Sequence, residues 1–202
     1  MIAVSNADTG LVLRCQANDA AAFNEIVARY KNKVHNYICR TIGPGPEAED
    51  LTQETFVRAY VNINSFQSRA SLNTWLFRIA TNICIDFLRK NKKISTMTIS
   101  LHREDTETED DVDMELADSR YDPQNVVLNQ ELGARLDQAL RSLPEKLRTV
   151  VLLHDIEGLP YEEITQIVDC PLGTVKSRLY NARVTLRKKL TPYLNGAMPW
   201  SA

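Results

Sequence analysis

An acidic stretch near the middle of the chain divides the sequence into two segments that can each form a small domain. Nine carboxylates and no aromatic residue lie between Arg103 and Arg120. A segment of this composition buries too little apolar surface to offset the conformational entropy that folding costs. We therefore predict a flexible acidic linker over 95–123 between two small domains. The same composition is equally typical of a solvated spacer with no further task.

The charge of the chain is distributed unevenly along its 202 residues. The formal net charge is −2, but 1–94 carries a net charge of +4, 95–123 carries −8 and 124–202 carries +2. Both predicted domains are therefore basic although the whole chain is slightly acidic. Such a distribution is compatible with nucleic-acid binding, which depends on local rather than total charge.

Helical periodicity dominates the first 94 residues. Apolar side chains recur at steps of three and four, which is the pattern of amphipathic helices. The turn Gly43-Pro44-Gly45-Pro46 separates the first long helix from the second. The predicted helices span 9–16, 20–39, 46–62 and 71–90. These helices predict a bundle of three or four helices.

The segment after the linker has the same periodicity and ends in a helix-turn-helix pattern, in which a short helix precedes a longer basic one. The predicted helices span 126–140, 145–156, 160–168 and 171–190. The last contains six Lys or Arg and no carboxylate between 172 and 190. Lys, Arg, Asn and Ser side chains on such a helix can contact base edges and phosphates. A basic run alone is also typical of a solvated face. The predicted fold class is all-α.

Other classes of protein find little support in the sequence. No apolar run approaches the roughly 18 to 20 residues that cross a bilayer, and the absence of a signal peptide predicts a cytoplasmic protein. The four cysteines form no Cys-x-x-Cys pair, and we expect buried thiols. No metal-ligand cluster, Ser/His/Asp set or phosphate-binding glycine loop is present. We predict no metal, no cofactor and no enzymatic activity.

Motifs in both halves resemble the extracytoplasmic-function (ECF) sigma factors of the sigma-70 family, of the sigma-E and sigma-W type. The motifs, in the family's order, are Asp50-Leu51-Thr52-Gln53-Glu54-Thr55-Phe56, Thr74-Trp75-Leu76-Phe77-Arg78-Ile79-Ala80, Ser142-Leu143-Pro144, Tyr161-Glu162-Glu163-Ile164 and Pro171-Leu172-Gly173-Thr174-Val175-Lys176-Ser177-Arg178. The resemblance covers roughly 10–95 and 124–190. Either half alone would be suggestive, and both in order are specific.

The resemblance implies a sigma factor of two domains. A region 2 domain at 1–94 would bind core RNA polymerase and the −10 promoter element, and a region 4 domain at 124–194 would bind the −35 element, followed by a tail at 195–202. The implied partners are core polymerase (through the coiled coil of its largest subunit and its flap region), promoter DNA and an anti-sigma factor. The linker would follow the RNA path of the polymerase.

The resemblance also assigns roles to matched residues. Those on the polymerase-binding surface would be Asp50, Gln53, Glu54 and Phe56. Those at the −10 element would be Ser65, Phe66, Ser68, Arg69, Asn73, Trp75, Arg78, Asn82, Arg89 and Lys90, with the loop 65–73 holding a flipped-out base. Those at the −35 element would be Thr174, Lys176, Ser177, Arg178, Tyr180, Asn181, Arg183 and Arg187. The spacing of Phe56 and Trp75 is equally typical of core residues. Relatives often carry Arg where this chain has Lys176 and Asn181.

A second class of function accounts for part of the sequence. A repressor or activator that binds duplex DNA without polymerase would explain the helix-turn-helix equally well. It leaves the first 94 residues without a task. A pull-down with core polymerase distinguishes the two functions.

Overall fold

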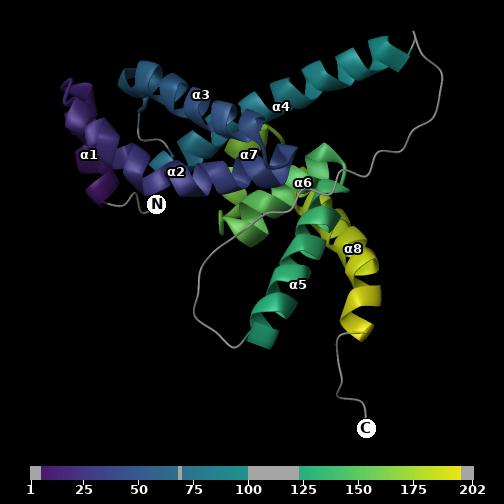
Figure 1. The fold of residues 1–202 in the computed structure, drawn as a ribbon. Helices are drawn as coiled ribbons and strands as arrows, with labels where there is room; N and C mark the ends of the chain where they lie inside the picture. The colour runs from purple at the N-terminus through teal and green to yellow at the C-terminus, as the bar shows by residue number, and fades with distance from the viewer. Residues whose placement is uncertain (1–5, 68–69, 100–122, 197–202) are drawn as a thin grey trace.

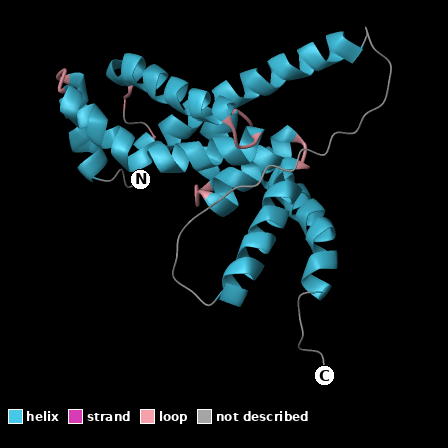
Figure 2. Ribbon diagram, viewed as in Figure 1, coloured by secondary structure: helices cyan, strands magenta, loops and turns pink. Residues whose placement is uncertain are grey.

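The computed structural model describes residues 6–67, 70–99 and 123–196, and every regular element in these ranges is helical (Figures 1 and 2). The elements are α1 (Asn6–Gln16), α2 (Ala20–Ile42), α3 (Pro46–Asn62), a 3₁₀ turn η1 (Ile63–Ser65), α4 (Leu72–Ile99), α5 (Pro123–Arg141), α6 (Glu145–Val151), a π-helical turn η2 (Leu152–Ile156), α7 (Tyr161–Val168) and α8 (Leu172–Gly196). This order confirms the all-α prediction. Most of the predicted linker, 100–122, lies outside the described residues, as do Ser68 and Arg69.

Short polar and glycine-containing segments determine where the first helices begin and end. The Asp19 carboxylate accepts hydrogen bonds from the backbone N–H groups of Ala21 (3.0 Å) and Ala22 (3.3 Å) and so caps α2. Gly43 ends α2 with φ of 105°, a conformation that favours glycine, and its N–H bonds the carbonyl of Cys39. Ser71 caps α4, because its Oγ accepts the N–H of Thr74 at 3.1 Å.

Helices α2, α3 and α4 enclose the core of the first domain. Tyr37 of α2 and Phe77 of α4 are fully buried and pack edge to face, with ring centroids 5.2 Å apart. The Tyr37 hydroxyl bonds Thr81 Oγ1 at 2.8 Å, which satisfies both polar groups inside the core. This contact fixes the spacing of the two longest helices of the domain.

Replacing Tyr37 by Phe tests this contact. We expect Tyr37→Phe to lower the free energy of unfolding by about 1–2 kcal/mol, because the Thr81 hydroxyl loses a partner in a buried site. Chemical denaturation measures the change. Tyr180→Phe is the matched control, since Tyr180 is 69% exposed. Equal stability of the two variants would show that the buried hydrogen bond contributes nothing.

The second domain is built from α5, α6, η2, α7 and α8. Leu140, Leu152 and Ile164 are fully buried at its centre. Spacing of four, three, four and four predicts an inward stripe on α8 that consists of Val175, Leu179, Ala182, Leu186 and Leu190. The first four are buried and Leu190 is half-buried. Burial of this stripe determines which side of the basic helix faces outward.

Several helix boundaries differ from the sequence prediction. The helix predicted to stop at 90 continues as α4 to Ile99, because no Gly or Pro interrupts 72–99. The helix predicted to stop at 190 includes Pro192, which removes only one backbone donor near the end of α8. The helix predicted over 145–156 changes from α to π hydrogen bonding at Leu152. Pro160 and Pro171 lie immediately before α7 and α8 rather than inside them.

The two domains pack directly against each other. Helix α7 lies along α4, and α5 and α6 contact α2 (Figure 1). The Arg148 guanidinium of α6 donates to the carbonyl of Thr41 near the end of α2 and to that of Leu143. Arg40 and Asp137 form an ion pair at 3.4 Å across the same boundary. One continuous cluster of buried apolar residues therefore runs through both domains.

Candidate polymerase and nucleic-acid interfaces

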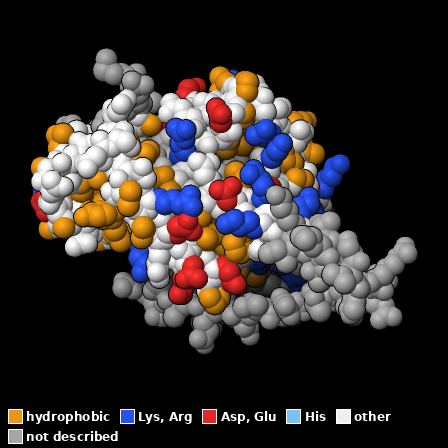
Figure 3. Space-filling view, turned by 90° about the horizontal axis from the view of Figure 1, so that it is seen from above, with side chains coloured by type: hydrophobic (Ala, Val, Ile, Leu, Met, Phe, Trp, Pro, Cys, Tyr) orange, Lys and Arg blue, Asp and Glu red, His pale blue; other side chains and the backbone are white. Residues whose placement is uncertain are grey.

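One side of α3 presents acidic and apolar side chains to solvent. Asp50 and Gln53 are exposed and Glu54 is half-buried in an ion pair with Arg58. One and two turns further along, Val57 and Val61 are 61% and 71% exposed, and Tyr60 is 55% exposed. We call the six residues Asp50, Gln53, Glu54, Val57, Tyr60 and Val61 the α3 face. Figure 3 shows exposed hydrophobic side chains at the end of the molecule where α1 and α3 lie.

Phe56 does not belong to the α3 face. Its side chain is buried with Thr52, Thr55 and Ala59 on the opposite side of α3. We therefore assign Phe56 to the core rather than to a binding surface. The motif did not include the three apolar residues of the α3 face. Val57 lies three residues after Glu54, and Tyr60 and Val61 lie three and four residues after Val57, so helical spacing would have placed all three on this face.

A second exposed face follows α4. Trp75, Arg78, Asn82 and Arg89 are three, four and seven residues apart and therefore share one side of the helix. Arg78, Asn82 and Arg89 are exposed, and Trp75 is half-buried. Arg89 forms a long ion pair with Asp86, at 3.6 Å. We call these four residues the α4 face, and Lys90 is exposed beside it.

The loop before α4 is tied to the rest of the first domain. Gln16 of α1 donates from Nε2 to the carbonyls of Ile63 and Phe66, both at 3.1 Å. Phe66 is buried and its ring packs on that of Trp75, with centroids 5.1 Å apart. Ser65 is exposed. Phe66 therefore supports the loop and the Trp75 ring from beneath, and Gln16 is a residue whose role the sequence alone did not indicate.

Asn73, in the first turn of α4, has an unusual polar environment. Its Oδ1 atom is buried and has no hydrogen-bond partner among the described residues. A buried carbonyl oxygen without a partner is costly. The helix that contains Asn73, α4, contacts α7 of the second domain.

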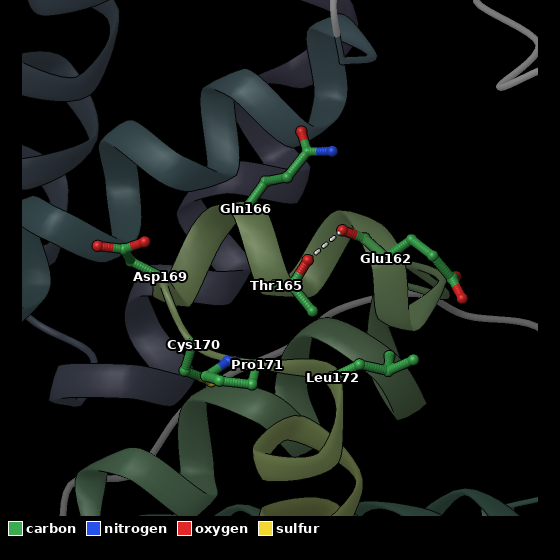
Figure 4. A pocket seen from close by; sticks show the side chains of 7 residues that line it. All are labelled: Glu162, Thr165, Gln166, Asp169, Cys170, Pro171 and Leu172. Atoms are coloured by element: carbon green, nitrogen blue, oxygen red, sulfur yellow. Dashed lines mark hydrogen bonds between the residues drawn. The ribbon is translucent and has the colours of Figure 1, made fainter.

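Helices α7 and α8 form a helix-turn-helix. Asp169 ends α7 in the left-handed conformation with φ of 45°, and the Pro171 carbonyl accepts the N–H of Thr174 at 2.8 Å to begin α8. Figure 4 shows a groove beside this turn, with Glu162 and Gln166 contributed by α7 and Leu172 by α8. Carboxylates at Glu162 and Asp169 make the groove unsuited to an anion.

The outward side of α8 carries most of the residues predicted to contact the −35 element. Lys176, Ser177, Asn181 and Arg187 are exposed, and the Tyr180 side chain is 69% exposed. Thr174 and Arg178 are half-buried, and Arg178 Nη1 lies 3.5 Å from Cys170 Sγ beneath the turn. The structure therefore brings the exposed residues of this set together on one surface, whereas Arg178 is directed back toward the domain.

Arg183 is exposed but already has a partner. Its Nε donates to Asp155 Oδ2 at 3.0 Å, and its Nη2 donates to Oδ1 of the same carboxylate. This bidentate pairing raises the pKa of Arg183 and leaves only the outer edge of the guanidinium for another acceptor. Asp155 of η2 therefore orients Arg183, which was predicted to contact the −35 element.

A small aromatic cluster borders the start of α8. The rings of His154 and Tyr161 lie 4.6 Å apart, and the Lys176 ammonium lies 5.8 Å from the centre of the Tyr161 ring. His154 Nδ1 is 2.9 Å from the carbonyl of Leu159. The attraction between Lys176 and the ring keeps this cation at the edge of the exposed surface.

Comparison with known protein families accounts for both domains. The Sigma-70 region 2 model matches residues 26–94, and the Sigma-70 region 4 model matches residues 133–186. The ECF RNA polymerase sigma-E factor of Haemophilus influenzae is 37% identical over 187 residues, which cover 93% of this chain and 97% of that protein. This chain is an ECF sigma factor of the sigma-70 family.

Further relatives agree with this assignment. The ECF sigma factor SigW of Bacillus subtilis is 39% identical over 179 residues, which cover 89% of the chain and 94% of the relative. Among solved structures, the sigma factor RpoE in complex with the anti-sigma factor NepR from Bartonella quintana superposes with a TM-score of 0.67 at 24% identity, over 84% of this chain and 96% of that one. At this identity, the similarity to the solved structure supports the fold alone.

The sigma factor acts in promoter-specific initiation of transcription, as its two family regions show. Region 2 corresponds to α2, α3 and most of α4, and region 4 extends from within α5 to within α8. Within the part of the chain that the structure describes, no helix is both long and apolar enough to cross a membrane. The predicted family is thereby confirmed, and the roles of individual residues remain predictions.

Proposed function

We propose that the chain binds core RNA polymerase through the α3 face, contacts the −10 element through the α4 face and contacts the −35 element through α8. The region 2 domain would comprise 1–94, the region 4 domain 124–194, the linker 95–123 and the tail 195–202. A chain that acts at promoter DNA together with polymerase is expected in the cytoplasm. We assign no enzymatic step to the chain itself. The family also implies an anti-sigma factor as a partner.

The composition of the α3 face supports the polymerase contact. It combines two carboxylates with Val57, Tyr60 and Val61, three large side chains that a folded monomer gains nothing by exposing. Apolar and aromatic groups bordered by charges are typical of protein interfaces. Protein rather than DNA is the expected partner, because phosphates would repel Asp50 and Glu54.

The chemistry of the α4 and α8 surfaces supports the DNA contacts. The α4 face carries two arginines, an amide and an aromatic ring, the side-chain types that contact the backbone and bases of a single strand. The exposed side of α8 carries Lys176, Asn181 and Arg187, which suit a major groove. The observation that carries the proposal is the location of these two surfaces on separate domains of one chain.

The proposed function predicts that promoter affinity depends on core polymerase. We expect the isolated protein to bind promoter duplex weakly and its complex with core polymerase to bind about 100-fold more tightly, because two weak contacts become linked through one partner. Fluorescence anisotropy with a labelled promoter, at one fixed salt concentration, measures both affinities. Tight sequence-specific binding by the isolated protein would instead support a stand-alone repressor or activator.

A further inference from the structure

A buried carboxylate joins the two domains at the start of α4. Glu163 of α7 is only 6% exposed, and it accepts hydrogen bonds from the hydroxyls of Thr74 and Ser71, the latter at 3.2 Å. Thr74 is itself 1% exposed. Ser71 caps α4, so the carboxylate lies at the positive end of the helix dipole of α4. Both hydroxyls donate to the same carboxylate oxygen, Oε2, across the interface between the domains.

The contact belongs to an extended boundary. Helix α7 lies along α4 in the same place, while Arg148 and Asp137 hold α5 and α6 to α2 on the other side. Burial at this second contact raises the pKa of Glu157, although Arg40 and Lys33 oppose the increase. Glu163 differs from Glu157 in that two hydroxyls of the other domain bond its carboxylate directly.

The closed arrangement is incompatible with simultaneous contact to both promoter elements. The −10 and −35 elements are about 25 base pairs apart, which is roughly 80 Å of duplex at 3.4 Å per base pair. Helix α8 packs on α7, and α7 packs on α4. While these contacts persist, α8 cannot lie roughly 80 Å from α4.

We propose that Glu163 is a latch that holds the free sigma factor closed by bonding Thr74 and Ser71, and that binding to promoter DNA requires this latch to open. The inference rests on the proposed function and adds a regulatory residue to it. The α3 face remains exposed in the closed form, so core polymerase can bind before the domains separate. The neighbouring Glu162 is exposed and provides a matched comparison.

The test compares Glu163→Ala with Glu162→Ala in the full-length chain, in the absence of polymerase. Hydrogen–deuterium exchange of the amides in 72–78 and 161–168 measures contact between α4 and α7, and small-angle X-ray scattering measures overall dimensions. We expect Glu163→Ala to speed exchange about tenfold, the loss that follows removal of a hydrogen-bonded charge, and to increase the radius of gyration. Glu162→Ala should match the wild type. Thr74→Val removes the latch from the other domain and should reproduce the effect of Glu163→Ala.

DNA binding completes the test. Free Glu163→Ala protein should bind promoter duplex about tenfold more tightly than the wild type, while its core-dependent transcription is retained. Unchanged exchange and dimensions in both Glu163→Ala and Thr74→Val would overturn the latch, as would opening without a gain in promoter affinity. Failure of the wild-type protein to direct transcription with core polymerase would instead refute the proposed function, whatever the exchange rates show.

Discussion

Reversing the charges of Asp50 and Glu54 to Lys is expected to weaken binding to core polymerase about 100-fold, since bringing like charges together at an interface costs several kcal/mol. The two carboxylates lie one turn apart on the α3 face, beside exposed Val57 and Val61. Titration of labelled core polymerase with Asp50→Lys/Glu54→Lys protein measures the change. The fold should survive, because the Glu54 and Arg58 side chains are 43% and 49% exposed and an ion pair at such a site contributes little to stability.

A control with the same change in net charge makes this result specific. Glu25 of α2 and Glu162 of α7 are exposed carboxylates that lie outside the α3 face. Glu25→Lys/Glu162→Lys should retain affinity within a few-fold. Equal affinity of both double variants for polymerase, with circular dichroism showing both folded, would remove the α3 face from the proposed interface.

Asn181 and Lys188 are expected to differ in how they affect promoter choice. Asn181 lies in the part of α8 that should enter the major groove, so Asn181→Ala should cost about 1–3 kcal/mol at one particular base pair and relax preference there. Lys188 is exposed two turns further along, where the helix should pass the backbone. Lys188→Ala should weaken all promoters similarly and lower the salt slope by about one.

Transcription from a library of −35 variants distinguishes these two roles. The Asn181→Ala protein should change the order of preferred sequences, and Lys188→Ala should lower output without changing that order. The opposite outcome, a new preference in Lys188→Ala and a uniform loss in Asn181→Ala, would mean that α8 enters the groove in another orientation. Lys176 lies near the Tyr161 ring and should act with Asn181 rather than with Lys188.

Periodicity was sufficient to predict most helices and the inward stripe of α8. Steps of three and four predicted Val175, Leu179 and Ala182 as buried, and the structure agrees. The sequence also predicted the turn at Gly43, where a positive φ is required. Helix ends were predicted less accurately. The helix predicted to end at 90 continues to Ile99, because α4 contains no helix-breaking residue before that point.

Contacts between elements distant in the chain could not be predicted from a motif. Phe56 was assigned to the polymerase-binding surface and Phe66 to the −10 element, yet both are buried. A family motif does not distinguish a residue that touches a partner from one that supports it. Arg183 was assigned to DNA, but its pairing with Asp155 depends on how η2 approaches α8. The position of Glu163 could have been recognised from the sequence. It lies four residues before the buried Ile167, and this spacing places its carboxylate on the apolar side of α7.

The orientation of Arg183 depends on the number of residues in the π turn at Leu152–Ile156, because this turn positions its partner Asp155. A π turn closes hydrogen bonds five residues apart rather than four, and here the N–H of Glu157 bonds the carbonyl of Leu152 at 3.0 Å. Deleting one residue from this turn would allow regular α winding and rotate the residues that follow by about 100° relative to those before it. Asp155 would then turn away from Arg183, while Val150 and Val151 upstream would stay in the core. An insertion or deletion in this turn would therefore change the orientation of Arg183, a residue proposed to contact DNA, without changing the sequence of α8.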